Sequence, residues 1–116
     1  GLWAVILKET GEFIGDCGIS MQKIDGELLP EIGYHVNKRY WQQGYAKEAC
    51  AAVKNWLFTQ TNFDCVYSYM NRENIASSAT AAANGMKRIK EYHDGKEALL
   101  VYAITREEWL GEPFLK

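Results

Sequence analysis

The sequence predicts a mixed α/β (α+β) domain in which two helices accompany a mostly antiparallel central sheet, in the order β-β-β-α-β-α-β-β. Short runs of bulky apolar residues, bounded by Gly, Asp and Asn, recur along the chain and are typical of strands. One long segment, 44–59, repeats apolar residues at helical spacing. A shorter Ala-rich segment, 74–84, lies between residues that commonly cap helices.

The first two strands are expected to form a hairpin. Residues 3–8 are an apolar run, and residues 13–22 form a second strand after the turn 9–12, where Gly11 tolerates positive φ. Residues 23–30 are predicted as a polar connection, and residues 31–37 as a third strand.

The segment 44–59 is predicted to be the longer helix, because its apolar residues recur at steps of three and four. This apolar stripe consists of Tyr45, Ala46, Ala49, Cys50, Ala52, Val53, Trp56 and Leu57. Lys54 is among the residues that lie off the stripe. A helix at this place can join two parallel strands by a right-handed crossover.

The second half of the chain predicts a strand at 64–70, a helix at 74–84 and a final hairpin of 86–92 and 97–105. Asn74 is expected to cap the helix, and Gly85 to end it at the C′ position. The tail is apolar and is expected to dock on another surface through Trp109, Leu110, Phe114 and Leu115.

Composition excludes several classes of protein. The 116 residues suit one domain, 1–116, and the net charge of -2 gives no basic field for nucleic acid or acidic lipid. No apolar run approaches the roughly 20 residues that span a bilayer. Three cysteines without CxxC spacing predict no disulfide framework and no metal site, and they fit a reducing cytoplasm.

Residues 40–49 form the most informative segment, because they join a predicted strand to a predicted helix N-terminus through a small-residue turn. The free amides of a first helical turn carry partial positive charge and bind phosphate. Gly44 has no Cβ and Ala46 has a small side chain, so a ligand could approach closely. The segment predicts a site for a phosphorylated cofactor; the alternative is a plain glycine-containing helix cap.

Four segments in this order resemble the GNAT superfamily of N-acetyltransferases, and the set is closest to its ribosomal-protein N-acetyltransferase branch. The first strand motif is Ile14-Gly15 followed by Gly18, and the cofactor-flanking strand is 31–36. The pyrophosphate loop and helix start correspond to 41–49, and the "Asn-x-x-Ser" segment to 74–78, followed by 84–86.

The chain also departs from the family pattern. Trp41 and Met86 replace more usual residues, and Ala81 stands where many members have a thiolate-protonating tyrosine. Family members usually have a strand and one or two helices before the first hairpin, whereas this chain enters its first strand directly after Gly1. An N-terminally truncated domain is therefore expected.

The resemblance implies transfer of an acetyl group from acetyl-CoA to a primary amine, by direct attack in a ternary complex and without a metal. The pyrophosphate would be held by Gln42, Gln43, Gly44, Tyr45, Ala46 and Lys47. The pantetheine arm would pair with backbone groups of Tyr34, His35 and Val36. Asn74 would bind pantetheine, cap its helix, or do both.

Three side chains are candidates for proton transfer. Glu31 and His35 lie an even number of residues apart on one strand, face the same side of the sheet, and could deprotonate the amine. Ser77 could protonate the departing thiolate, with Ser78 as second candidate. The alternatives are a solvated charge for Glu31, a hydrogen-bonded filler for His35, a helix cap for Ser77, and catalysis by proximity without a base.

Three interpretations of the whole chain remain open. The first is an active acetyltransferase whose acceptor is a small-molecule amine or a protein N-terminus. The second is a catalytically weak or inactive acyl-CoA-binding or regulatory module of the same fold. The third is an interaction subunit, including a homo-oligomer that completes its site with a neighbouring copy.

Overall fold

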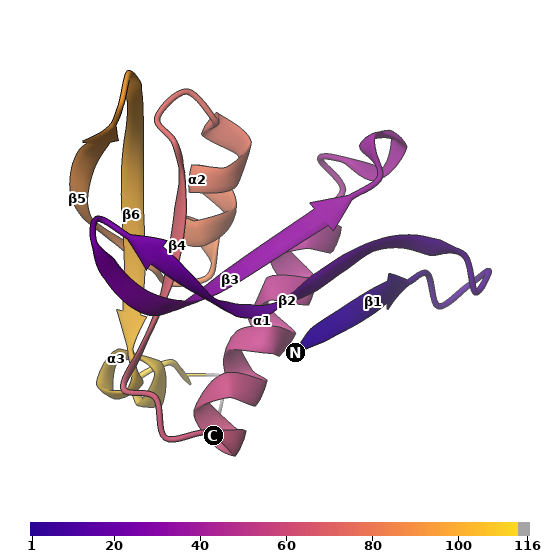
Figure 1. Cartoon of the computed structure of the whole chain (residues 1–116). Helices are drawn as coiled ribbons and strands as arrows, with labels where there is room; N and C mark the ends of the chain where they lie inside the picture. The colour runs from indigo at the N-terminus through magenta and orange to yellow at the C-terminus, as the bar shows by residue number, and fades with distance from the viewer. Residues whose placement is uncertain (114–116) are drawn as a thin grey trace.

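The computed structural model describes residues 1–113 of the chain. One mixed six-stranded sheet has the strand order β1-β2-β3-β4-β6-β5 (Figure 1). The strands are β1 (Leu2–Ile6), β2 (Phe13–Ile24), β3 (Glu27–Val36), β4 (Cys65–Asn71), β5 (Lys87–Asp94) and β6 (Glu97–Thr105). Helix α1 (Tyr45–Gln60) follows β3, and α2 (Ile75–Ala83) follows β4. The predicted fold class and element order are confirmed.

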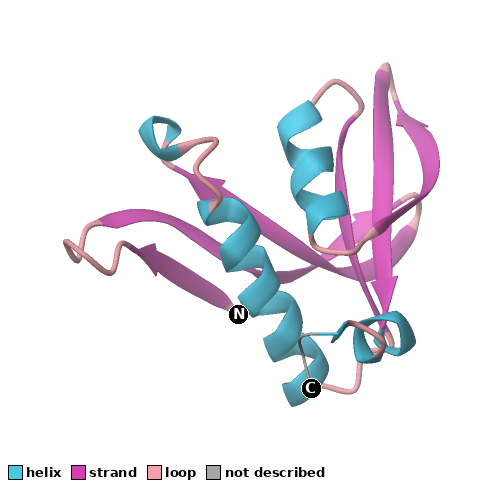
Figure 2. Cartoon of the chain, turned by 180° about the vertical axis from the view of Figure 1, so that it is seen from behind, coloured by secondary structure: helices cyan, strands magenta, loops and turns pink. Residues whose placement is uncertain are grey.

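Helices α1 and α2 lie on the same face of the sheet (Figure 2). One hydrophobic cluster joins them to the sheet: Leu57 of α1 and Ala81 of α2 share it with Ile32 of β3 and Val66 of β4. The sheet therefore holds both helices in fixed positions relative to the ends of β3 and β4.

The long β2–β3 hairpin bends across the opposite face of the sheet (Figure 1). Its turn residue Asp25 forms an ion pair of 3.0 Å with Lys90 of β5. Ile24 and Val101 are fully buried, although neither belongs to the cluster under the helices. The bent hairpin thus encloses a second apolar layer.

The prediction of a polar connection at 23–30 is wrong, because β2 and β3 run to a two-residue turn. Asp25 and Gly26 have φ values of 49° and 83°. Positive φ at both central residues is the geometry of tight hairpin turns, and the Asp-Gly pair favours it. Leu28 and Leu29 consequently pair with Lys23 and Gln22 in the ladder.

Strands β3 and β4 are the parallel pair joined by α1, as the crossover prediction required. Their ladder contains one pair, Glu31 with Tyr67. Antiparallel ladders flank this pair on both sides, β2 with β3 and β4 with β6. The sheet is therefore continuous but opens between the carboxyl ends of its two central strands.

Helix α1 buries one residue that the apolar pattern placed on its polar side. Lys54 is 4% exposed, and its ammonium donates to the Asn84 carbonyl at 2.9 Å and to the Glu112 carboxylate at 2.8 Å. The Asn84 side chain in turn donates to the Lys47 carbonyl at 3.2 Å. These polar contacts link α1 to the end of α2. They stabilise Lys54 in a buried position although the apolar periodicity of α1 placed it on the exposed side.

A short helix, α3 (Arg106–Leu110), was not predicted. Thr105 and Glu108 form a capping box at its start, a sequence signature of helix N-termini. Trp109 stacks on Phe58 of α1 with ring centroids 5.2 Å apart, so part of the tail docks on the chain itself. Leu110 is exposed, so the expectation that it docks is wrong. Phe114 and Leu115 of that prediction lie outside the described residues.

Within residues 1–113, no helix combines the length and apolarity that crossing a bilayer requires.

Gly15 marks a close approach between β2 and β3. A Cβ at this position would overlap the backbone carbonyl oxygen of His35, which cannot move without breaking the ladder. At Gly33 the nearest atom is instead a carboxylate oxygen of Glu31, 3.2 Å away, on a side chain that can rotate.

We therefore expect Gly15→Ala to lower the free energy of unfolding by about 1–3 kcal/mol through overpacking. Gly33→Ala is the matched control and should cost clearly less. Urea denaturation of the two variants measures the difference, and equal midpoints would contradict the proposed backbone clash.

Candidate active site

The gap between β3 and β4 is closed at its inner end by side chains. Beyond the Glu31–Tyr67 pair, the Ser68 hydroxyl donates to the Ile32 carbonyl at 3.2 Å. The Tyr69 backbone amide stabilises the charged carboxylate of Glu31. Side-chain contacts thus replace the missing ladder bonds where the strands separate.

The pairing of β2 with β3 decides which backbone groups point into the gap. The Asn37 amide donates to the Ile14 carbonyl at 2.7 Å, and hydrogen-bonded pairs alternate along an antiparallel ladder. His35 therefore directs its backbone toward β2, whereas Tyr34 and Val36 direct theirs toward the gap. The Val36 carbonyl already accepts from the Trp41 indole at 2.7 Å. The Tyr34 amide and carbonyl and the Val36 amide remain directed into the gap.

Helix α1 begins beside the open end of this gap. Its N-cap residue is Gly44, so no side chain of that residue accepts a hydrogen bond from the first-turn amides. The first-turn amides belong to Tyr45, Ala46 and Lys47. By contrast, the Asn74 side chain caps α2 by accepting from the Ser77 amide at 3.1 Å. The predicted capping role of Asn74 is confirmed, and the uncapped first turn of α1 is the better anion-binding end.

The loop before α1 depends on unusual backbone angles. Gln42 has φ of 63° and Gly44 has φ of 85°. A Cβ at Gly44 would meet no atom within 4 Å, so glycine serves the left-handed conformation here and the space beside it is open. The Gln43 side-chain amide donates to the Arg39 carbonyl at 3.4 Å and helps to fix the loop.

A small cavity lies between β3, α1 and α2 at the depth of the gap. Its polar lining includes Tyr34, Ser68, Ser77 and Thr80. The Tyr34 hydroxyl donates to the Ser77 hydroxyl at 3.5 Å, which joins β3 to α2 across the gap. Ala81 lines the same cavity one helical turn after Ser77 and contributes no hydroxyl. The cavity therefore brings together hydroxyl groups from β3, β4 and α2, and the sequence did not predict that they lie close to one another.

Glu31 and His35 face the side of the sheet opposite the helices, as their even spacing predicted. Glu31 is half-buried, and burial raises its pKa to about 7, although the Tyr69 amide opposes the shift. The His35 side chain is 90% exposed, and its Nδ1 lies 3.2 Å from Asp16 Oδ1. Glu31 therefore has the environment of a group that exchanges protons near neutral pH.

Tyrosines surround Glu31 on this face. Tyr67 is its ladder partner, and burial raises the pKa of Tyr67 to about 12. Burial also raises the pKa of Tyr69, whose hydroxyl donates to Gln22 at 3.5 Å. Gln22 comes from the bent hairpin, so its place in the site could not be predicted while that strand was expected to end there.

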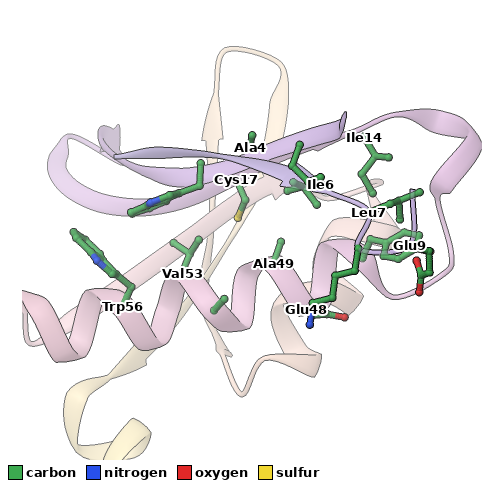
Figure 3. A pocket seen from close by; sticks show the side chains of 15 residues that line it. Ala4, Ile6, Leu7, Glu9, Ile14, Cys17, Glu48, Ala49, Val53 and Trp56 are labelled. Carbon is green, nitrogen blue, oxygen red and sulfur yellow. The ribbon is translucent and has the colours of Figure 1, made fainter. Parts of the chain in front are cut away.

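A separate groove of about 650 Å³ lies between β1 and α1 (Figure 3). Ala4, Ile6, Ala49 and Val53 are among its apolar lining residues. Trp3 and Trp56 meet edge to face at one end, with ring centroids 4.9 Å apart. Apart from Tyr45 at the start of α1, the groove shares no lining residue with the β3–β4 gap. Among the described residues, no cluster of three His, Cys, Asp or Glu side chains is arranged to hold a metal.

Comparison with known families identifies the class of protein that this arrangement represents. Residues 1–87 match the acetyltransferase (GNAT) domain family, and the chain belongs to that family. Among curated relatives, the Bacillus subtilis protein YkkB is 36% identical over 101 residues, covering 87% of this chain and 59% of YkkB. The N-acetyltransferase p20 of Bacillus licheniformis is 28% identical, covering 94% of this chain and 64% of p20. The chain thus spans less than two thirds of each relative.

Solved structures confirm the predicted GNAT-like fold. A GNAT acetyltransferase from Bacillus anthracis superimposes with a TM-score of 0.76 at 28% identity, over 91% of this chain and 66% of that one. The ribosomal-protein-S5-alanine acetyltransferase of Vibrio fischeri gives 0.76 at 19% identity, over 93% and 62%. Aminoglycoside acetyltransferase AAC(6')-Ib, solved with coenzyme A, gives 0.78 at 14% identity, over 95% and 68%. The last two likenesses show the fold alone.

The raised pKa of Glu31 predicts a pH-dependent stability. Its folded-state pKa of about 7 exceeds the ordinary value of 4.5, so the fold favours the protonated carboxyl. The stability that this group contributes is fully present below pH 4.5 and is lost as the pH rises through 7. Glu31→Gln keeps a neutral side chain, so it should match the wild type near pH 4 and exceed its stability at pH 8 by on the order of 1–3 kcal/mol.

Urea denaturation at a series of pH values measures this difference. Glu27→Gln, at the exposed start of the same strand, is the control and should show no such divergence between pH 4 and pH 8. A constant difference between Glu31→Gln and the wild type at every pH would contradict the assigned environment of Glu31.

Proposed function

We propose that this chain binds acetyl-CoA in the gap between β3 and β4 and transfers the acetyl group to a primary amine by direct attack in a ternary complex. The observation that carries the proposal is the coincidence of two features at one place. The Tyr34 amide and carbonyl and the Val36 amide face the gap without a ladder partner on β4 among the described residues, and the uncapped first turn of α1 lies at its open end. Membership of the acetyltransferase family supports the choice of cofactor.

The cofactor would lie along the gap with its two ends in different environments. The pyrophosphate would accept hydrogen bonds from the amides of Tyr45, Ala46 and Lys47 and from the loop residues Gln42 to Gly44. The amides of the pantetheine arm would pair with Tyr34 and Val36 as an added strand. The Val36 or Tyr34 N–H could also stabilise the oxyanion that forms on the thioester carbonyl. Asn74 lies at the start of α2 and could hold pantetheine in addition to capping.

The acceptor amine would approach from the face of the sheet that carries Glu31, which is the face opposite the helices. Glu31 would take the proton of the ammonium or of the tetrahedral intermediate, directly or through water. A carboxylate whose pKa is about 7 can accept and release a proton at neutral pH. His35 is the second candidate base, paired with Asp16 at the same face.

Collapse of the tetrahedral intermediate releases the thiolate of coenzyme A, which needs a proton. Ser77 is the proposed donor, and its oxygen accepts a hydrogen bond from the Tyr34 hydroxyl at 3.5 Å. Proton donation by Ser77 could then be followed by transfer from Tyr34 to Ser77. This arrangement would supply the acid function although Ala81 provides no hydroxyl.

A second candidate function is a catalytically weak or inactive acyl-CoA-binding module. Ala81 favours this alternative, because it contributes no hydroxyl to the cavity that Ser77 lines. Mixing the protein with acetyl-CoA and a panel of amines, and following thiol release, separates the two. Binding with turnover supports the transferase, binding without turnover on any amine supports the module, and no binding contradicts the cofactor site.

The acceptor and the assembly are further matters of proposal. The ribosomal-protein branch stays a prediction, because the neighbours with this fold also include an aminoglycoside enzyme. A cytoplasmic location and a homo-oligomer likewise stay predictions.

A negative charge at Gly44 tests whether the N-terminus of α1 binds the pyrophosphate. Gly44→Asp would place a carboxylate beside the pyrophosphate, so the Kd for coenzyme A should rise at least about tenfold by charge repulsion. Gly44→Asn is the matched control, since both side chains tolerate the left-handed conformation and have the same shape. Isothermal titration calorimetry measures both, and equal affinities of the two variants would exclude this loop as the phosphate site.

Turnover measurements distinguish a catalytic role of Ser77 from that of its neighbour Ser78. Ser77→Ala should lower kcat by about 10- to 100-fold through loss of proton transfer, while the Kd for acetyl-CoA changes less. Ser78→Ala is the control, because the Ser78 hydroxyl donates to the Ile75 carbonyl within its own helix. Unchanged kcat in Ser77→Ala would return Ser77 to a structural role.

A further inference from the structure

Two buried cysteines, Cys17 of β2 and Cys50 of α1, face each other between the sheet and the helix. Their sulfur atoms lie 3.9 Å apart, and the residues are 33 positions apart in the chain. The side chains are 1% and 5% exposed and belong to the same hydrophobic cluster. The third cysteine, Cys65, lies on β4, where its thiol contacts the Val66 carbonyl. The apolar stripe predicted for the longer helix included Cys50, but the contact of Cys50 with Cys17 was not predictable.

The separation of the two sulfur atoms is close to what a disulfide needs. A disulfide has an S–S distance of about 2.05 Å, so the sulfurs must approach by about 2 Å. Rotation about the two Cα–Cβ bonds moves the sulfurs without displacing β2 or α1 as units. The thiols already contact each other directly, so no side chain has to leave the space between them.

We propose that Cys17 and Cys50 are a modification site that hydrogen peroxide converts into an intramolecular disulfide. Cys17 lies at the wall of the groove between β1 and α1, whereas Cys50 is not among the lining residues, so a small oxidant in the groove would approach Cys17 first (Figure 3). Cys17 is therefore the attacking sulfur, and Cys50 is the resolving one. A hydrogen bond from Cys50 lowers the pKa of Cys17, which favours the thiolate, although burial and the charges of Asp16 and Glu31 oppose the shift.

The reaction balances in two steps. The Cys17 thiolate attacks one peroxide oxygen, the O–O bond breaks, and hydroxide leaves and takes up the proton that Cys17 had lost. The Cys50 sulfur then attacks the sulfenic sulfur, the S–O bond breaks, and hydroxide leaves and takes the Cys50 proton. Two thiols and one hydrogen peroxide thus give one disulfide and two waters.

The disulfide would fasten the middle of β2 to the second turn of α1, the helix whose first residue is Tyr45. Closing a long loop restricts the unfolded chain, so the oxidised protein should have a higher Tm. Disulfide formation does not require acetyl-CoA, so its failure would leave the acetyl-transfer proposal intact, and the reverse also holds.

The test uses the folded wild type and Cys65→Ser, treated with hydrogen peroxide and then alkylated. Before alkylation, both should be monomers that are lighter than the untreated protein by two hydrogen atoms. They should also yield a cross-linked peptide containing Cys17 and Cys50, show a higher Tm, and revert with dithiothreitol. Cys17→Ala and Cys50→Ala, first shown by circular dichroism to be folded, should form no cross-linked peptide.

Three results would overturn the proposal. The first is oxygen addition to Cys17 in the folded protein without a disulfide. The second is a bridge that involves Cys65 or a second copy of the chain in place of the Cys17–Cys50 pair. The third is no reaction in the folded protein under conditions in which the urea-unfolded protein forms the bridge.

Discussion

The single ladder pair between β3 and β4 is the constraint on which the rest of this structure depends. In the part of the chain that the structure describes, Glu31 and Tyr67 form the one ladder pair of the two central strands. Beyond this pair and the neighbouring Ser68–Ile32 hydrogen bond, the strands separate. A longer ladder would satisfy the backbone groups of Tyr34 and Val36 internally, and a sheet without this pair would fall into two halves. One pair keeps the sheet continuous while leaving polar backbone open to a ligand.

Both helices are fixed relative to this opening by burial and by polar contacts. Asn84 ends α2, donates to the Lys47 carbonyl in the first turn of α1, and accepts from Lys54. The ends of the two helices are therefore tied together on one face, where the proposed cofactor would bind. The opposite face carries Glu31 under the bent β2–β3 hairpin, where the proposed acceptor would enter. In this proposal the sheet would separate the two substrates, and they would meet at the gap.

The sequence was sufficient for the order of elements because local signals marked each one. Apolar periodicity marked α1, Asn74 and Gly85 marked the limits of α2, and the glycine-containing loop marked the phosphate-binding candidate. The features missed depend on contacts between distant residues. The length of the β2–β3 hairpin depends on packing under the bend. The burial of Lys54 depends on its contacts with Glu112 and Asn84. The contact between Tyr34 and Ser77 depends on the separation of β3 from β4. The helix α3 is the exception, since its Thr105–Glu108 capping box was visible in the sequence.

The central claim is that the β3–β4 gap and the first turn of α1 form one coenzyme A site. Titration of ¹⁵N-labelled protein with coenzyme A, followed by amide chemical shifts, tests it most directly. The account predicts the largest shifts at the amides of Tyr34, Val36, Tyr45, Ala46 and Lys47. Saturable shifts confined to the groove residues of β1, or no shifts at all, would contradict it.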